Sequence, residues 1–254
     1  MKKRRKTSHK GENGIVLVIG GSELYIGAPI LTTIAAQATG IDLAYLAAPK
    51  EVALIANVYS PDIISIKLPG RHLTQHHIPE FKKFIEKADC IAIGPGLGLD
   101  KETITAVRKI VKTEKPKVID ADALNSIKGI DVRNCILTPH HGEFLRMFGE
   151  PGNYQTIKKH ARKDKIILLK GPVDLVSDGK KVYSIHGGTD AMTVGGTGDV
   201  LTGIAAGLVA KGCPLLEAAI KASRINKKAG EIVFKKKKYG LLASDLVNEI
   251  PRLV

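Results

Sequence analysis

Short apolar runs alternate along the chain with segments whose apolar residues recur at helical spacing. The runs are rich in β-branched residues, which is typical of buried strands. We expect strands at residues 15–19, 43–47, 63–68, 90–93, 118–120, 136–138 and 166–170. Helices are predicted between them, most clearly at residues 28–38, 101–112, 153–163 and 215–234. The alternation predicts a three-layer α/β/α sandwich with a mostly parallel central sheet.

The alternation of predicted strands and helices ends after residue 170. Two short apolar runs, 175–177 and 182–185, flank the turn Asp178-Gly179, and this pattern indicates a β-hairpin. The sheet is therefore expected to end with antiparallel strands near the C-terminal part. Since no repeat or low-complexity linker divides residues 11–254, we predict one domain there, preceded by a basic leader at residues 1–10.

Composition narrows the class of protein. The chain has 254 residues and 44% hydrophobic content, enough for a substantial core. No apolar run reaches the roughly 18 residues of a membrane span, and the charged N-terminus lacks the apolar region of a secretory signal. We expect a soluble, cytoplasmic protein with no membrane partner. Cys90, Cys135 and Cys213 have no CxxC spacing, which favours buried, reduced thiols over a metal site or disulfides.

The formal net charge of +14 raises the question of a nucleic-acid partner. The charge is concentrated near the ends, in the leader and in the run Lys235 to Lys238. Aromatic residues make up only 4% of the chain and Trp is absent, so little material exists for base stacking. We therefore interpret the basic runs as a solvated leader and a charged helix end, and expect no sequence-specific nucleic-acid binding. Weak, salt-sensitive RNA association stays open.

The run Gly195-Gly196-Thr197-Gly198-Asp199 leads directly into an apolar helical pattern at residues 200–211. Glycines at a helix N-terminus leave backbone N–H groups that favour an anion, so residues 196–198 are a candidate phosphate site. A carboxylate beside phosphate costs energy by repulsion. Asp199 is therefore expected to take a proton from a substrate hydroxyl, or to hydrogen-bond it. The alternative is a glycine turn with a capping Asp.

Glycines also follow two of the predicted strands, where open α/β sheets place ligands. Gly20-Gly21-Ser22 comes after the first strand, and Gly94-Pro95-Gly96-Leu97-Gly98 comes after the strand at 90–93. Such turns let a ligand approach the backbone closely. They serve equally well where a helix packs tightly against a strand.

Titratable residues follow three further strands. Asp120 and Asp122 could orient a metal-bound water or cap the next helix, and capping is the favoured interpretation. In His140-His141-Gly142-Glu143, either His could donate to a substrate and Glu143 could hold a water of a magnesium ion. The alternative is a loop with ordinary surface histidines. Lys170 could face a nucleotide phosphate or simply leave the core for solvent.

Taken in order, these motifs resemble the ADP- or ATP-dependent NAD(P)H-hydrate dehydratases, which have the ribokinase-like fold. The resemblance spans nearly the whole chain. It is carried by GGS and YIGA at 20–28, GPGLG at 94–98, DADALN at 120–125, TPHHGE at 138–143, LKGPVD at 169–174 and MTVGGTGDVLTG at 192–203. It implies a repair enzyme that removes water from the S epimer of hydrated NADH or NADPH, with ADP or ATP as co-substrate and Mg²⁺.

The resemblance also implies roles for individual positions. It places Asp199 as the catalytic residue, and the amides of Gly196, Thr197 and Gly198 as the anion hole. The expected contacts to the hydrated dinucleotide are Ala28, Gly98, His140 and Asp199. The expected nucleotide contacts are Lys170, Gly171, Pro172, Val173, Asp174 and Gly198. The metal ligands are not specified.

Two departures concern the nucleotide region. The chain reads Gly188-Thr189-Asp190-Ala191-Met192 where the family often has Asn before the Met, and it has Asp174 where Thr is frequent. Family resemblance further suggests a homo-oligomer, plausibly a tetramer, and a separate epimerase.

Two other functions stay open on the residues alone. One is a small-alcohol kinase of the hydroxyethylthiazole kinase type, because the fold does not fix the product. The other is a nucleotide-binding or RNA-associated protein that has lost catalysis, although the intact Asp199 argues against it.

Overall fold

The computed structural model describes residues 4–254. Its sheet has nine strands in the order β3-β2-β1-β4-β5-β6-β7-β8-β9. The strands from β3 to β7 are parallel, whereas β8 pairs antiparallel with β7 and β9 antiparallel with β8. The predicted architecture and hairpin are confirmed. The strands are β1 (Ile15–Ile19), β2 (Leu43–Pro49), β3 (Ile64–Leu68), β4 (Cys90–Ile93), β5 (Lys117–Ile119), β6 (Cys135–Leu137), β7 (Lys165–Leu169), β8 (Asp174–Ser177) and β9 (Val182–Ile185).

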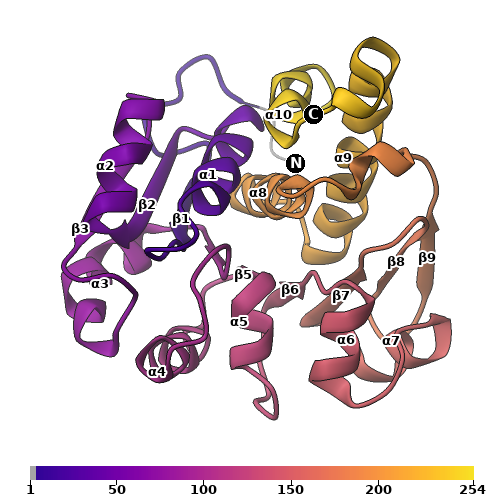
Figure 1. The fold of residues 1–254 in the computed structure, drawn as a ribbon, viewed down its shortest axis with the longest axis horizontal. Helices are drawn as coiled ribbons and strands as arrows, with labels where there is room; N and C mark the ends of the chain where they lie inside the picture. The colour runs from indigo at the N-terminus through magenta and orange to yellow at the C-terminus, as the bar shows by residue number, and fades with distance from the viewer. Residues whose placement is uncertain (1–3) are drawn as a thin grey trace.

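Helices cover both faces of the sheet (Figure 1). One layer holds α1 (Gly27–Ala38), α2 (Lys50–Tyr59), α8 (Thr197–Ala210), α9 (Leu215–Lys237) and α10 (Ala243–Glu249). The other holds α3 (Ile78–Lys87), α4 (Lys101–Ile110), α5 (Ala121–Ser126), α6 (His141–Phe148) and α7 (Tyr154–His160). Single-turn 3₁₀ helices lie at η1 (Gln75–His77), η2 (Asp190–Thr193), η3 (Lys238–Gly240) and η4 (Ile250–Arg252). The four predicted helices are confirmed, with ends that differ by up to three residues.

Two apolar cores lie on opposite faces of the sheet. In β1, Val16 and Val18 join the core beneath α1 and α8, while Leu17 and Ile19 join the core beneath α3 and α4. Successive side chains of a strand point to opposite faces, so a strand buried on both faces reads as a continuous apolar run.

Helices α1 and α8 approach closely because α8 carries glycines on the face toward α1. A methyl group at Gly203 would overlap the carbonyl oxygen of Thr32, and one at Gly207 would overlap the side chain of Thr39. The Thr32 hydroxyl also donates to the carbonyl oxygen of Asp199 at 3.2 Å. Contact with α1 therefore fixes the position of the first turn of α8.

The basic ends differ in how they are held. Lys2 and Lys3 of the predicted leader lie outside the described residues. Arg4 pairs with Asp42 at 2.7 Å, and Asp42 also accepts from the backbone N–H groups of Gly11 and Asn13, so this part of the leader is tied to the domain. The second basic run forms the last turn of α9, as predicted, where Lys236 and Lys237 pair with Glu249 and Asp245.

Two expectations about the chain as a whole can be compared with the fold. All three cysteines are buried and free, as predicted. Between residues 4 and 254, none of the helices is long and apolar enough to cross a bilayer.

We predict that Gly203→Ala destabilises the fold by about 1–3 kcal/mol, because the added methyl group must push α8 away from α1. Chemical denaturation measures this change. Gly27→Ala, in α1, is the matched control, since nothing lies within 4 Å of a methyl group there. Equal stability of the two variants would contradict the close packing of α1 and α8.

Candidate active site

The first turn of α8 presents unpaired backbone donors. Gly196 precedes the helix with a φ of +95°, a left-handed conformation that glycine adopts at low cost. The Thr197 hydroxyl donates to the carbonyl oxygen of Met192 at 2.9 Å and so holds the turn. Among residues 4–254, no acceptor faces the N–H groups of Thr197, Gly198 and Asp199. This arrangement fits an anion, as the glycine pattern predicts.

Asp199 lies half-buried in this turn, and its carboxylate receives no hydrogen bond from a described residue. Burial raises the pKa of this group to about 8, and the negative charge of Asp120 acts in the same direction, against the opposing effect of Lys170. A raised pKa makes this carboxylate, once it is ionised, a stronger proton acceptor than an ordinary aspartate. The capping role left open for Asp199 is wrong, since no side chain caps α8.

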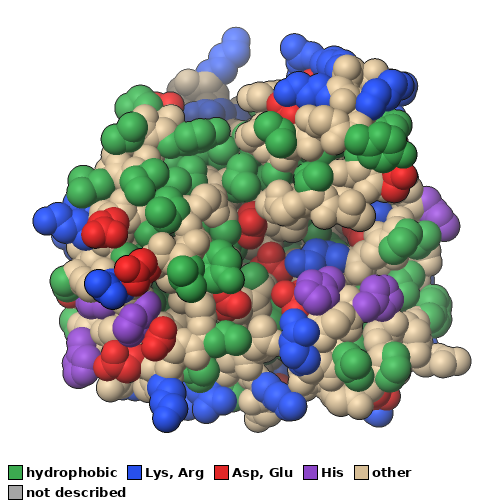
Figure 2. Space-filling model, viewed as in Figure 1, with side chains coloured by type: hydrophobic (Ala, Val, Ile, Leu, Met, Phe, Trp, Pro, Cys, Tyr) green, Lys and Arg blue, Asp and Glu red, His purple; other side chains and the backbone are tan. Residues whose placement is uncertain are grey.

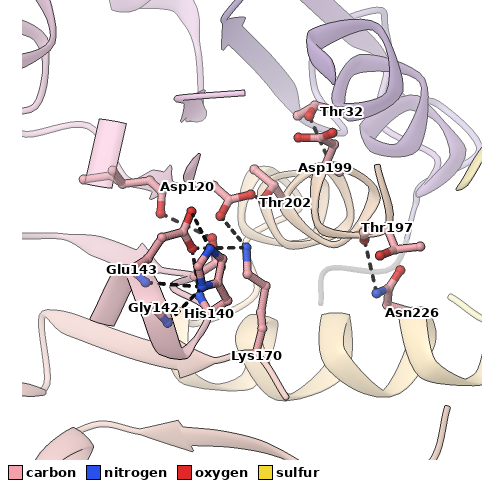
Figure 3. Close-up of polar contacts among 12 residues, drawn as sticks. Thr32, Asp120, His140, Gly142, Glu143, Lys170, Thr197, Asp199, Thr202 and Asn226 are labelled. Atoms are coloured by element: carbon pink, nitrogen blue, oxygen red, sulfur yellow. Dashed lines mark hydrogen bonds and ion pairs between the residues drawn. The ribbon is translucent and has the colours of Figure 1, made fainter. Parts of the chain in front are cut away.

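Lys170 follows β7 and turns inward rather than toward solvent. Its ammonium lies 2.7 Å from Asp120 Oδ1 and 3.9 Å from Glu143 Oε2 (Figure 3). Burial alone would lower the pKa of Lys170, but Asp120 and Glu143 outweigh it and raise that pKa, so the group stays charged. A methyl group built on Gly198 would lie 3.3 Å from Lys170 Nζ, which places the ammonium under the N-terminus of α8.

Asp120 does not cap α5, contrary to the favoured interpretation. One of its oxygens accepts from Lys170, and the other accepts from the Thr202 hydroxyl of α8 at 2.7 Å (Figure 3). Asp122 instead accepts from the N–H of Gly98 at 2.9 Å. The two aspartates therefore connect the ends of β5, β4 and β7 to α8.

His140 begins a helix, α6, where an ordinary surface loop was the alternative. Its Nδ1 accepts from the N–H groups of Gly142 and Glu143 at 3.0 and 3.2 Å, and Glu143 Oε2 accepts from the N–H of His140 at 2.8 Å. Because Nδ1 is an acceptor, the proton of the neutral ring is on Nε2, 3.6 Å from Glu143 Oε1. His140 can thus donate through Nε2.

The predicted nucleotide segment lines a cavity of about 760 Å³ together with the loop at 187–194 and the N-terminus of α8. Lys170, Gly171, Pro172 and Asp174 face this cavity, whereas Val173 does not line it. In Figure 2, acidic and basic side chains gather at the floor of a hollow near the centre of this face.

Asp174 is buried and fully engaged within the protein. It accepts from the N–H of Gly171 at 2.9 Å and from the Ser223 hydroxyl at 2.7 Å, and Lys227 Nζ lies 3.5 Å away. Lys227 also donates to the carbonyl oxygens of Gly171 and Pro172. Asp174 therefore shapes the loop, which accounts for a carboxylate at this position.

Sequence reasoning missed two residues of α9 that line this cavity, Asn226 and Lys227. Asn226 donates to the carbonyl oxygen of Thr197 at 3.3 Å (Figure 3). Both lie in an ordinary amphipathic helix pattern, so no local signal distinguishes them.

The expected dinucleotide contacts do not gather in one cavity, because His140 lines the first cavity described above. Gly98 lines a second cavity together with Asp122, and Ala28 packs beside Gly96 in the loop after β4. Gly198 lines the first cavity, and the charge of Asp122 acts on Asp199. Asp199 therefore lies next to a residue of the first cavity and within the electrostatic reach of a residue of the second, at the carboxyl ends of the parallel strands.

Comparison with known proteins agrees with this geometry. A model of the family described as NAD(P)H-hydrate dehydratase matches residues 16–252. The bifunctional NAD(P)H-hydrate repair enzyme of Pyrobaculum aerophilum is 42% identical over 99% of this chain, which spans 52% of that protein's length. The ADP-dependent (S)-NAD(P)H-hydrate dehydratase of Cenarchaeum symbiosum is 40% identical over 99% of this chain and 92% of its own.

Solved structures give the same assignment. The ADP/ATP-dependent NAD(P)H-hydrate dehydratase of Bacillus subtilis, co-crystallised with ATP/Mg²⁺, superposes with a TM-score of 0.84 and 26% identity over 100% of this chain and 93% of its own. Hydroxyethylthiazole kinase of Pyrococcus horikoshii has a TM-score of 0.64 and 20% identity over 96% of this chain and 89% of its own, a likeness of fold alone. The chain belongs to the NAD(P)H-hydrate dehydratase family.

Proposed function

We propose that the chain converts the S epimer of hydrated NADH or NADPH back to the reduced cofactor, with ADP or ATP as phosphoryl donor. The observation that carries this proposal is the Asp199 carboxylate, which has no hydrogen-bond partner within residues 4–254 and follows the N–H groups of Thr197 and Gly198, which have no acceptor there either. The named relatives favour this activity over the small-alcohol kinase alternative.

The first chemical step is phosphoryl transfer. The nucleotide occupies the cavity lined by Lys170 and Gly198, with its terminal phosphate at the N-terminus of α8. Asp199 takes the proton of the substrate hydroxyl, whose oxygen forms a bond to phosphorus while the bond to the departing nucleotide breaks. The N–H groups of this turn and the Lys170 ammonium stabilise the charge on the transferring group. ADP then yields AMP, and ATP yields ADP.

The second step is elimination. The bond between the ring carbon and the phosphate oxygen breaks as the lone pair of the ring nitrogen moves toward that carbon. Loss of a proton from the neighbouring carbon restores the double bond of the reduced nicotinamide. The sum is hydrated cofactor plus nucleotide giving reduced cofactor, shortened nucleotide and inorganic phosphate.

The donor set fits a magnesium ion that arrives with the nucleotide. Among the residues that the structure describes, no group of three or more His, Cys, Asp or Glu side chains could hold a metal ion. Magnesium commonly uses one or two carboxylates together with substrate phosphates. We propose that Glu143 holds a water of this ion, which would neutralise charge on the phosphate oxygens.

The family resemblance also bears on the oligomeric state and on a partner enzyme. We propose that the chain forms a homo-oligomer, a tetramer, and that a separate epimerase acts on the other epimer, both on the family resemblance. The chain spans about half the length of the Pyrobaculum relative, so the activity of any longer protein lies beyond these residues.

The direct test is to mix the purified chain with hydrated NADH, magnesium and either ADP or ATP. The absorption band of reduced nicotinamide in the near ultraviolet should recover with at least one nucleotide, and inorganic phosphate should be released in equal amount. A flat absorbance with both nucleotides, or phosphate retained on the product, would contradict the proposal and favour a kinase.

Replacement of the proposed base gives a sharper result. Asp199→Asn should lower turnover by a factor on the order of 100 or more, while nucleotide binding persists, because the isosteric amide cannot take the hydroxyl proton. Asp62→Asn, at an exposed position distant from the site, is the control.

The same variant should change the pH dependence of stability. The pKa of Asp199 is about 8 in the folded chain against an ordinary value of 3.8, so the native state loses stability as pH rises from about 4 to about 8. Asp199→Asn should therefore raise Tm by an amount that grows across that window and is absent near pH 4. A Tm difference independent of pH would contradict the burial of this charge.

A further inference from the structure

The second cavity, of about 350 Å³, lies at the carboxyl ends of β1, β4 and β5. It is formed by residues from three segments, 22–25, 71–72 and 97–100, with Asp122. Neither Asp199 nor any residue of α8 lines it. If the reacting ring contacts Asp199, this cavity receives a part of the substrate remote from that ring.

The hydroxyl of Ser22 is the first sign of a ligand here. Ser22 is only 8% exposed and lines the cavity, where a methyl group on Gly98 would lie 4.0 Å from its Oγ. Within residues 4–254, this Oγ has no hydrogen-bond partner. The residue is largely buried, but its Oγ stays accessible, so the Ser22 hydroxyl is available to a polar group of a ligand.

The charges of the cavity exclude some ligands. Glu23, Asp100 and Asp122 supply three carboxylates. The cations that line it are already paired: Arg71 lies 3.5 Å from Glu23, and His72 lies 3.3 Å from Glu102. The described lining therefore carries an excess of negative charge, three carboxylates against the one guanidinium of Arg71, and disfavours a phosphate. Carboxylates do suit sugar hydroxyls, and an acidic side chain at a strand end is a known partner of an unphosphorylated ribose.

The rim of the cavity is apolar. Leu24, Tyr25 and Leu99 are 83%, 54% and 52% exposed, which is unusual for large apolar side chains so close together. An aromatic ring beside two leucines is a surface on which a flat base can stack. A ligand with a flat base, sugar hydroxyls and no phosphate on the sugar would fit these features, and such a ligand is a nucleoside.

We propose that this cavity binds the adenosine half of the hydrated dinucleotide, with Ser22 and the carboxylates facing a ribose that carries a free 2′-hydroxyl. The inference rests on the proposed function. Its consequence is that the chain prefers hydrated NADH to hydrated NADPH, because the 2′-phosphate of the latter would meet Glu23, Asp100 and Asp122, against which Arg71 is the one arginine or lysine in the described lining.

The first experiment compares the two hydrates with saturating nucleotide. We expect kcat/KM to be roughly ten-fold or more higher for hydrated NADH, given the energy of like charges a few ångströms apart. Regeneration of both at equal kcat/KM, or faster use of hydrated NADPH, would overturn this inference and leave the proposed function intact. Failure with both hydrates would instead contradict the proposed function and, with it, the inference.

Variants of the cavity separate recognition from folding. Ser22→Ala should raise KM for hydrated NADH several-fold with kcat unchanged, because contacts remote from the reacting ring bind ground state and transition state alike. Ser184→Ala, at an exposed position of β9, is its control. An unchanged KM in Ser22→Ala, at unchanged Tm, would overturn the assignment of Ser22.

Whereas Ser22→Ala should weaken binding, Glu23→Gln should improve the use of hydrated NADPH. It releases Arg71 for the 2′-phosphate and removes a negative charge, so the preference for hydrated NADH should shrink several-fold through better use of hydrated NADPH. Glu86→Gln removes a comparable exposed carboxylate, paired with Lys82 on α3, and should leave the ratio unchanged. An identical ratio in Glu23→Gln and the unaltered chain would contradict the electrostatic basis of the selection.

Discussion

The site depends on the ion pair between Lys170 and Asp120, which lies beneath the N-terminus of α8. Asp120 joins three elements, because it follows β5, accepts from Lys170 after β7 and accepts from Thr202 of α8. Removal of the Lys170 charge would leave the Asp120 carboxylate buried without a cation, which is strongly unfavourable. The pair therefore places a permanent positive charge beside the free N–H groups of α8, where a phosphate would bind.

Unlike Asp120, Asp199 is not paired with a cation, and this difference explains how one site can serve both substrates. Asp120 is matched by a cation and a hydroxyl, whereas the Asp199 carboxylate has no partner among the described residues and its pKa is raised to about 8. Burial, together with the nearby carboxylates, raises the pKa of Asp199, and the Lys170 ammonium keeps the site attractive to phosphate. The close packing of α8 on α1, through Gly203 and Thr32, fixes the position of the turn that carries this carboxylate.

The strands and the glycine motifs could be predicted because their signals are local. Continuous apolar runs mark strands buried on both faces, and Asp178-Gly179 marks the hairpin. A helix after Asp120 was expected without bounds, and α6 was not predicted, since six or eight residues carry too little periodicity. The role of Asp120 was wrong for another reason: its partners Lys170 and Thr202 lie 50 and 82 residues away. The positions of Asn226 and Lys227 likewise follow from the packing of α9.

The central claim is that the substrate hydroxyl is phosphorylated at the N-terminus of α8 before it leaves. Its most direct test uses hydrated NADH that carries a heavy oxygen isotope in the added hydroxyl. After one turnover with the nucleotide that supports the reaction, mass spectrometry locates the label. The account predicts that the heavy oxygen is found in inorganic phosphate. Label in water, with unlabelled phosphate, would mean that the nucleotide is hydrolysed separately and would contradict the account.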